Sequence, residues 1–321
     1  MTLPNFLIIG AMKTGTTSLY YYLKQHPQVY MSHIKAPDFF AWEGWDLNFD
    51  GPEGRAEVNR RIKLTSITNI DDYRALFNGV SSETAIGEAS PCYLYSDEAP
   101  GRIKHYIPEA RLIASLRNPV DRAYSAYLQL VRLVREPLDD FAQALRAEEE
   151  RIQKNREWIW HYKSMGFYYS QLKRYYETFE PEQLKVYLYE DLQNDPIGVV
   201  QDCFRHVGVD DTFTPDISFR YHSSGVPKNR ALHRFLTTPN RTKVVLKSIL
   251  PQAPARRLWE RALHTNLAKP LPVRQEVRKE LIELYRQDIL KLEDLIQRDL
   301  SSWLDPHAAP AGTSLQEARA V

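Results

Sequence analysis

The stretch FLIIGAMKTGTTSLYYYLKQHP, residues 6–27, decides the fold. Its first five residues are apolar and form a run short enough to be a buried strand, and a glycine turn then leads into a helical pattern. A strand, a glycine turn and a helix together offer a phosphate backbone N–H groups and the positive end of a helix dipole. The sequence therefore predicts an anion-binding loop directly after a core strand.

The lysine of this loop is displaced from the place that a nucleotide-binding P-loop gives it. Gly10 and Gly15 have the P-loop spacing and Thr17 fits its last position, but Thr16 stands where the lysine belongs. The lysine is Lys13, inside the loop. In a kinase the lysine reaches the β- and γ-phosphates. A lysine inside the loop instead suits a 5′-phosphate and its nearest bridging oxygen, the leaving-group position of a phosphosulfate.

Composition narrows the classes of partner. The chain has 321 residues, 43% of them hydrophobic, which is enough material for a globular core. Its 42 Lys and Arg balance 41 Asp and Glu, so net charge gives no reason to expect binding to nucleic acid. The two cysteines are too few for a disulfide framework, and no apolar run is long enough to span a membrane. We therefore expect no membrane insertion and a cytoplasmic location.

Short apolar runs alternate with helical patterns along the chain. The runs at 6–10, 84–88, 111–116 and 184–189 read as strands. Alternation of strands and helices predicts an α/β fold, in which helices flank a central parallel sheet. Asn118 before Pro119 and Asp195 before Pro196 are helix-start signals, because each pairs a capping side chain with proline at the first helical position.

The organisation of the chain favours a single domain over residues 1–304. Residues 273–304 carry apolar side chains at helical spacing and predict an amphipathic helix that closes the domain. Residues 42–69 are rich in Gly, Pro, Asn and charge and predict a long surface excursion. We expect the Ala- and Pro-rich tail at 305–321 to be disordered.

Several segments carry a family resemblance, in order along the chain. They are KTGTT (13–17), GEASPCYLY (87–95), LIASLRNPVDRAYSAY (112–127), GFYYSQLKRYYETF (166–179), LKVYLYEDLQNDP (184–196) and FRYHSSGVPKNRALHRFL (219–236). Together they resemble the sulfotransferases that use 3′-phosphoadenosine-5′-phosphosulfate (PAPS), in particular bacterial-type enzymes related to the heparan sulfate sulfotransferase domain. The resemblance implies a P-loop-like sulfotransferase fold, PAPS as sulfuryl donor and 3′,5′-bisphosphoadenosine as product.

The resemblance also implies the residues that hold the donor. Lys13 takes the bridging oxygen, the loop holds the 5′-phosphate, a strand-end arginine and a helix serine hold the 3′-phosphate, and a basic loop closes over the nucleotide. The implied donor-binding residues are Lys13, Thr14, Gly15, Thr16, Thr17, Ser18, Arg117, Ser125, Ser224, Gly225, Lys228 and Arg230. The migrating sulfuryl group carries less negative charge than a phosphoryl group, so we expect no metal.

The base that takes the proton of the acceptor is the open question. Many relatives carry a glutamate for this role in a K-E-P-x-F-F stretch, but the corresponding residue of IKAPDFFAW (34–42) is Ala36. Either a substitution has removed the base, or another residue supplies it. The candidates are Asp38, His33, Glu43, Glu88 and His161. We place Asp38 first, as a catalytic residue with Lys13, because it is nearest to position 36 on the same segment.

The acceptor itself is a hydroxyl or amine on a carbohydrate or small molecule. Side chains that suit its pocket are Lys35, Phe39, Glu88, Tyr93, His161 and Tyr168, amid further aromatic residues. Two other functions stay open at this point. KVYLYED (185–191) with Asp191 as an Mg²⁺ ligand would suit a small-molecule kinase, and a non-catalytic nucleotide-binding protein would use the same loop. The sequence leaves the oligomeric state open.

Overall fold

A computed structural model of the chain describes residues 2–218, 225–237 and 265–308. Its centre is the strand β1, Phe6–Gly10, whose five residues are all buried. Side chains of a strand alternate between the two faces of a sheet. Leu7 and Ile9 accordingly join one hydrophobic cluster and Phe6 and Ile8 the other. Because apolar side chains leave β1 on both faces, helices must cover both faces of the sheet.

The described residues form a five-stranded sheet in the order β2-β3-β1-β4-β5, and all its paired strands are parallel. The strands are β1, β2 (Val29–Met31), β3 (Ala85–Ala89), β4 (Arg111–Leu116) and β5 (Leu184–Leu188). The predicted parallel sheet and four of its strands are thus confirmed, within one residue at each end. The strand β2 was not predicted, since three residues are too short to show a period.

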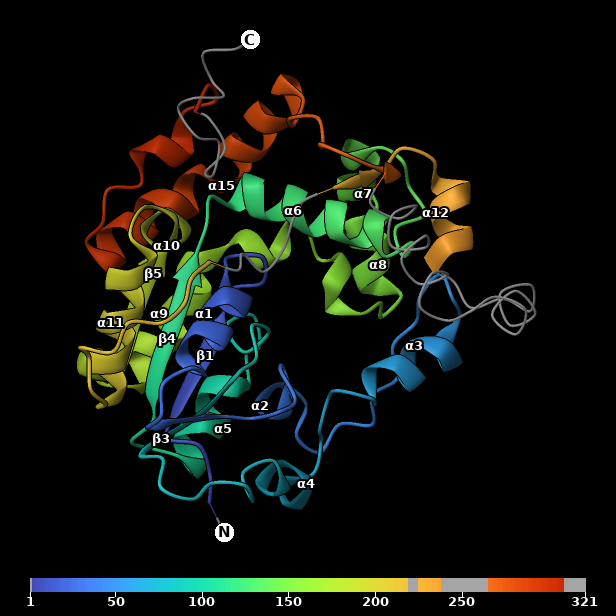
Figure 1. Cartoon of the computed structure of the whole chain (residues 1–321). Coiled ribbons are helices and arrows are strands. Elements are labelled where there is room, and N and C mark those ends of the chain that lie inside the picture. Colours follow the sequence, from blue (N-terminus) through green and yellow to red (C-terminus); the bar gives the residue numbers. More distant parts are fainter. Residues whose placement is uncertain (1, 219–224, 238–264, 309–321) are drawn as a thin grey trace.

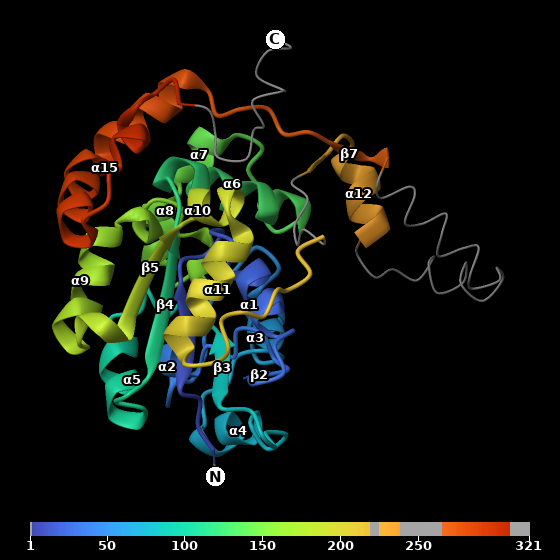
Figure 2. The ribbon, with the colours of Figure 1, turned by 60° about the vertical axis from the view of Figure 1, so that its left-hand side comes forward.

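The helices lie in two layers on either side of this sheet (Figures 1 and 2). One layer holds α1 (Thr16–Leu23) and α11 (Pro196–Val207), which pack against each other and the sheet. The other holds α5 (Ala99–Tyr106), α6 (Pro119–Arg132), α9 (Tyr168–Thr178) and α15 (Gln275–Ile296). Figure 1 shows α6 and α15 at the end of the molecule opposite the N-terminus, where the parallel strands finish.

Two predicted helix starts are confirmed. The Asn118 side chain accepts hydrogen bonds from the first-turn amides of α6, and the Asp195 side chain accepts one from Gly198 of α11. The helix predicted over 273–304 is shorter than expected. α15 ends at Ile296, because Gln297 adopts a left-handed conformation, and a separate 3₁₀ turn spans Ser301–Leu304.

Most of the segment 42–69 lies at the surface, as predicted, but the segment also inserts apolar side chains into the core. It contains the helix α3, Arg55–Ile62, whose Val58 and Ile62 are buried, and Leu47 and Phe49 before it are buried as well. These four apolar residues are spaced irregularly among Gly, Pro and charged residues. For this reason no local period revealed them.

Short elements complete the described fold. They are α2 (Phe39–Trp42), α4 (Ile70–Ala75), α7 (Phe141–Arg146), α8 (Glu148–Gln153), α10 (Tyr189–Asn194), α12 (Arg230–Thr237), the antiparallel pair β6 (Val226–Pro227) and β7 (Leu267–Ala268), and 3₁₀ turns at Trp158–Trp160, Ser164–Gly166 and Pro181–Gln183. Of the predicted tail, residues 309–321 lie outside the described residues. None of the described helices has the length and apolar character needed to cross a membrane.

Candidate active site

The site lies at the carboxyl ends of the parallel strands, around the loop that links β1 to α1. The sheet order places β1 between β3 and β4. After β1 the chain continues to β2, which lies on the β3 side of the sheet, and after β3 it crosses to β4 on the other side of β1. In open α/β sheets, ligands bind outside the carboxyl ends of the strands at such a switch point. The fold therefore gathers the loops after β1, β2, β3 and β4 around one region.

The loop after β1 is fixed from beneath by β4. Ala11 donates its backbone N–H to the carbonyl of Ser115, and the Ser115 hydroxyl donates to the carbonyl of Thr14 at 2.8 Å. The Thr14 hydroxyl is buried and donates to the carbonyl of Ala11 at 2.7 Å. The predicted donor-binding residue Thr14 thus braces the loop through its side chain.

Gly15 allows the loop to turn into α1. Its φ of 91° lies in the left-handed region, and a Cβ at this position would approach Leu192 to 2.7 Å. Helix α1 begins at the next residue, Thr16, without a side-chain cap on its first amides. Thr16 is buried, whereas Thr17 and Ser18 are partly exposed beside it. The helix start therefore presents backbone N–H groups and hydroxyls, a suitable set of donors for a phosphate.

Lys13 lies in a strongly cationic environment. Burial, and then the positive charges of Arg117, Arg132 and Lys35, lower the pKa of Lys13 to about 8. These cations come from three separate segments of the chain, which the fold brings together around the loop. Like charges held close together destabilise one another. The cluster is therefore suited to a multiply charged anion.

Arg117, the first residue after β4, lies next to the same loop. Its guanidinium packs over the Tyr189 ring at 4.6 Å, and its Nη1 donates to the carbonyl of Lys13 at a long 3.5 Å. The Nε of Arg117 is buried and has no hydrogen-bond partner among the described residues. Ser125 follows on the adjoining helix α6 and is partly exposed. The arginine thus has spare hydrogen-bonding capacity at a rigid position.

Asp38 begins the short helix α2 from a left-handed conformation, with φ of 57°. The Cys92 thiol donates to its Oδ1 at 2.9 Å, and the Ser66 hydroxyl donates to its Oδ2 at 3.4 Å. Burial raises the pKa of Asp38 to about 6, although these donors and Lys35 oppose the rise. A carboxylate with a pKa just below neutrality can accept a proton at physiological pH.

Lys35 and Ala36 are both partly buried on the segment that precedes Asp38. Burial lowers the pKa of the Lys35 ammonium, while the nearby carboxyls of Asp38 and Glu88 act to raise it. Ala36 is left-handed as well, with φ of 60°. The structure therefore brings a cation and a carboxyl together beside Ala36.

Glu88 is fully buried near the end of β3. Its carboxylate accepts hydrogen bonds from the hydroxyls of Tyr93 at 2.7 Å, Ser90 at 2.8 Å and Tyr73 at 3.2 Å. Burial raises the pKa of Glu88 to about 7, against the effect of these donors. As a candidate base, Glu88 has no exposed surface through which to reach an acceptor.

The other candidate bases have different surroundings. His33 is exposed. Glu43 accepts a short hydrogen bond from Tyr106 and pairs with Arg102 at 3.6 Å. His161 is buried, with its Nδ1 3.0 Å from the Tyr95 hydroxyl, and burial lowers the pKa of its imidazole. Asp38 is therefore the candidate that combines partial exposure with a pKa near neutrality.

The aromatic residues predicted for the acceptor pocket lie mostly in the core. Phe39, Tyr93 and Tyr168 are fully buried, and Phe39 stacks on the Tyr73 ring at 4.4 Å. Trp158 and Tyr95 are partly exposed, and the Trp158 ring contacts both the Tyr95 ring and the buried ring of Trp42. The three fully buried rings therefore offer an acceptor no exposed surface.

The basic segment predicted to cover the nucleotide is described only in part, because Ser224 lies outside the described residues. Gly225 is buried against Leu267. Lys228 is exposed and donates its Nζ to the carbonyl of Thr265 at 2.9 Å, and Arg230 pairs with Asp139. Both cations therefore have contacts within the chain.

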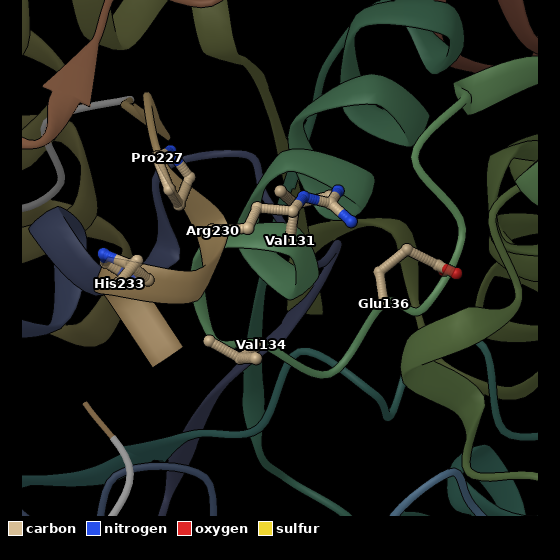
Figure 3. A pocket seen from close by; sticks show the side chains of 6 residues that line it. All are labelled: Val131, Val134, Glu136, Pro227, Arg230 and His233. Atoms are coloured by element: carbon tan, nitrogen blue, oxygen red, sulfur yellow. The ribbon is translucent and has the colours of Figure 1, made fainter. Parts of the chain in front are cut away.

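Arg230 also lines a small cavity of about 30 Å³ between α6 and α12 (Figure 3). The other lining residues are Val131, Val134, Glu136, Pro227 and His233. Since this volume is far too small for a nucleotide, the cavity marks the packing of α12 on α6.

Sequence reasoning did not identify the residues that surround Asp38 and Lys13 from other segments. Ser66, Ser90 and Cys92 contact Asp38, and Arg132 contributes charge at Lys13. Ser90 directly follows β3, and its position at a strand end was the available signal. Arg132 lies two helical turns after Ser125, on the same face of α6, but that face became informative only when the fold was known.

Two structural features bear on alternative chemistry. Asp191, the residue that a kinase would use for Mg²⁺, accepts from the backbone amide of Leu188 and from the guanidinium of Arg298 at 2.8 Å. Its carboxylate is thereby engaged in a helix cap and an ion pair. Within the described parts of the chain, no group of three His, Cys, Asp or Glu side chains is arranged to hold a metal ion.

Comparison with known proteins adds independent findings. The profile of the sulfotransferase family matches residues 4–213. The chain is 35% identical to the crystal structure of a sulfotransferase from Alicyclobacillus acidocaldarius, with a TM-score of 0.72 over 95% of this chain and 100% of that one.

Among curated proteins, human bifunctional heparan sulfate N-deacetylase/N-sulfotransferase 3 is 31% identical over 212 residues. That match covers 64% of this chain and 22% of the human protein. The membrane-associated sulfotransferase kil1 of Dictyostelium discoideum is 34% identical over 127 residues, or 40% of this chain and 23% of that protein. The chain thus spans under a quarter of the length of these curated relatives.

Proposed function

The chain belongs to the sulfotransferase family, and we propose that it moves the sulfuryl group of PAPS to a hydroxyl or amine acceptor on a carbohydrate or small molecule. The observation that carries the proposal is the cluster of cations around the loop that links β1 to α1, which we call the β1 loop. Lys13 lies there beside Arg117, and a buried Nε of Arg117 has no partner among the described residues. A donor that bears phosphate groups at both ends of a ribose fits two adjoining anion sites.

In this proposal the β1 loop and the start of α1 hold the 5′-phosphate. Backbone N–H groups and the side chains of Thr16, Thr17 and Ser18 supply its hydrogen bonds. Arg117 and Ser125 hold the 3′-phosphate, because a guanidinium offers two parallel donors to phosphate oxygens. Lys228 lies on the segment proposed to close over the nucleotide.

The reaction forms one bond to sulfur and breaks another. The acceptor oxygen or nitrogen attacks sulfur, while the bond between sulfur and the bridging oxygen of the 5′-phosphate breaks. Lys13 stabilises the negative charge that develops on this leaving oxygen. Asp38 takes the proton that the acceptor loses, and 3′,5′-bisphosphoadenosine leaves with the bridging oxygen.

The kinase alternative is not favoured. The displaced lysine lies inside the loop, and the Asp191 carboxylate is used by Arg298 and the backbone of α10. The family match and the similarity to a sulfotransferase structure point in the same direction. A non-catalytic nucleotide-binding protein would retain the donor site but show no transfer to any acceptor.

The test is calorimetric binding of 3′,5′-bisphosphoadenosine, ATP and 5′-AMP without magnesium. We expect the bisphosphate to bind most tightly, because only it fills both anion sites. Arg117→Ala should cost about 2–4 kcal/mol of bisphosphate affinity, as two charge-assisted hydrogen bonds are lost. Arg60→Ala, at an exposed ion pair with Glu57 on α3, is the matched control. Equal affinity for ATP, or an unaffected Arg117→Ala protein, would restore the kinase alternative.

Transfer is tested with labelled PAPS against a panel of carbohydrates, lipids and small alcohols and amines. Label that moves to an acceptor distinguishes an enzyme from a nucleotide-binding protein. The acceptor that reacts best also reports the substrate class. No transfer to any of them, in a protein that binds the bisphosphate tightly, would favour the non-catalytic alternative.

A further inference from the structure

The segment that carries Asp38 has an unusual backbone. Ala36 and Asp38 both have positive φ angles, 60° and 57°, although neither is glycine. Left-handed backbone costs a non-glycine residue roughly 1–2 kcal/mol. The surrounding structure must therefore hold this turn in place. The contacts that hold it identify the residues on which the position of the Asp38 carboxyl depends.

Two backbone amides of the segment bind side-chain hydroxyls from the turn after β3. The N–H of Asp38 donates to the Ser90 hydroxyl at 2.9 Å, and the N–H of Phe40 donates to the Tyr93 hydroxyl at 3.4 Å. Each hydroxyl then donates its own proton onward, and both protons go to Glu88. Ser90 binds its Oε2 at 2.8 Å and Tyr93 its Oε1 at 2.7 Å.

The fully buried Glu88 carboxylate is thus the common end of two parallel chains of hydrogen bonds. Chains of hydrogen bonds polarise one another, so a hydroxyl that donates to a carboxylate is a better acceptor for an amide. A carboxylate can accept on both oxygens at once. A glutamine in its place would offer one acceptor oxygen and an NH₂ group, so one of the two chains would lose its end.

We propose that Glu88 is a positioning residue, which aligns the Asp38 carboxyl for proton abstraction by anchoring the backbone of residues 38–40 through Ser90 and Tyr93. This inference rests on the proposed role of Asp38 as the base. It gives a role to a buried carboxyl that cannot itself contact an acceptor. It also explains why both hydroxyls of the turn at 90–93 face the same group.

Tyr73 provides a matched control. Its hydroxyl also donates to Oε1 of Glu88, at 3.2 Å, yet no hydrogen bond joins that hydroxyl to the described backbone of residues 38–40. Tyr73→Phe removes one donor from Glu88 and keeps the ring that stacks on Phe39. Ser90→Ala and Tyr93→Phe each break one chain and leave Glu88 in place.

The first measurement is amide hydrogen exchange at Asp38 and Phe40 in the full chain without ligands. We expect Glu88→Gln to speed exchange of both amides about tenfold or more. The Ser90 and Tyr93 hydroxyls accept hydrogen bonds from these amides, and the substitution weakens the bonds that fix the two hydroxyls in place. Ser90→Ala should affect Asp38 most, and Tyr93→Phe should affect Phe40 most. Tyr73→Phe should leave both rates within about twofold to threefold.

The second measurement is transfer at saturating PAPS, together with bisphosphate affinity. We expect Glu88→Gln to lower kcat about 10- to 100-fold, as is typical when a supporting residue is lost. Bisphosphate affinity should change less than about twofold, since the donor site is elsewhere. Ser90→Ala and Tyr93→Phe should each lower kcat by a smaller factor. These two variants keep the test valid if Glu88→Gln does not fold.

The outcomes separate this inference from the proposed function. Unchanged amide exchange in Ser90→Ala and Tyr93→Phe, or a Tyr73→Phe protein as impaired as Glu88→Gln, would overturn the anchoring role alone. Full turnover in Asp38→Asn would overturn Asp38 as the base and, with it, the catalytic purpose of the anchor. Faster exchange together with lower kcat and unchanged bisphosphate binding would support both.

Discussion

At the scale of single residues, the identity of the base is the main question, because Ala36 cannot accept a proton. The neighbouring Asp38 has a pKa raised by burial to about 6, so its carboxylate form is present above pH 6 and is lost below it. We therefore expect kcat/KM to decrease as the pH is lowered through about 6. Asp38→Asn should lower turnover by about 10²–10⁴ and abolish that decrease, as expected for loss of a general base.

Ala36→Glu is the companion variant to Asp38→Asn, measured at saturating PAPS on one common acceptor. If Asp38 is the base, an added glutamate at position 36 should change turnover little or crowd the acceptor. His161→Ala serves as the second comparison, because burial lowers the pKa of that imidazole and so favours its proton-accepting form. A large gain in Ala36→Glu, beside full activity in Asp38→Asn, would show that position 36 has lost the base.

Lys13 carries the second residue-scale prediction. Its pKa of about 8 in the free protein means that the ammonium is present below pH 8 and is lost above it. Bisphosphate affinity should therefore decline above pH 8, by up to about tenfold per pH unit, because binding must then restore the proton. Lys13→Ala should lack this decline, and it should lower turnover more than affinity. Calorimetry from pH 6.5 to 9.5 measures both proteins.

A bisphosphate affinity that stays level through pH 9 in the wild type would contradict the lowered pKa of Lys13. So would a decline that persists unchanged in Lys13→Ala. Near-normal turnover of Lys13→Ala at saturating donor would show that the lysine does not act on the leaving oxygen.

At the scale of elements, the cap of α11 provides a stability prediction away from the site. The Asp195 carboxylate accepts from the backbone N–H of Gly198 at 2.9 Å, at a helix that starts with Pro196. Asp195→Ala should lower the free energy of unfolding by about 1 kcal/mol, and Asp195→Asn by much less, since asparagine caps equally well. Denaturant unfolding measures both variants, and equal losses in the two would exclude capping as the cause.

The elements that sequence could predict were those with a strong local signal. β1 and β4 combine apolar runs with clear ends, and α6 and α11 start at a capping residue followed by proline. β2 has three residues and α3 lies in a Gly- and Pro-rich stretch, so their structure depends on contacts with distant residues. The strand, glycine turn and helix around residues 6–23 were predictable because their residues are contiguous.

The acceptor side of the site could be predicted less well, for a related physical reason. Asp38 receives its partners from residues 66, 90 and 92, and Lys13 receives its neighbouring charges from residues 35, 117 and 132. Burial fixes the pKa of each group, and burial follows only from the packed fold. Sequence alone could nominate Asp38 and Glu88 together, but it could not tell that Asp38 is a partly exposed residue and Glu88 a fully buried one.

At the scale of the whole molecule, donor binding should couple to stability, because the free protein holds several like charges together at the β1 loop. A ligand present at 100 times its Kd stabilises the folded state by about 2.7 kcal/mol. For a chain of this size we expect 3′,5′-bisphosphoadenosine to raise Tm by roughly 4 °C. Differential scanning calorimetry measures the shift, with Arg117→Ala at the same ligand concentration as control. An equal shift with ATP would argue against a site built for two separate phosphates.

The position of β1 in the sheet also has a consequence for biosynthesis. β1 is the most buried strand, yet its two neighbours, β3 and β4, begin only at Ala85 and Arg111. At translation rates of about 5–20 residues per second, the apolar run FLIIG is synthesised several seconds before either of its partner strands. During synthesis this run is therefore the natural binding site for a chaperone. A slower ribosome would lengthen the time for which the nascent chain can aggregate.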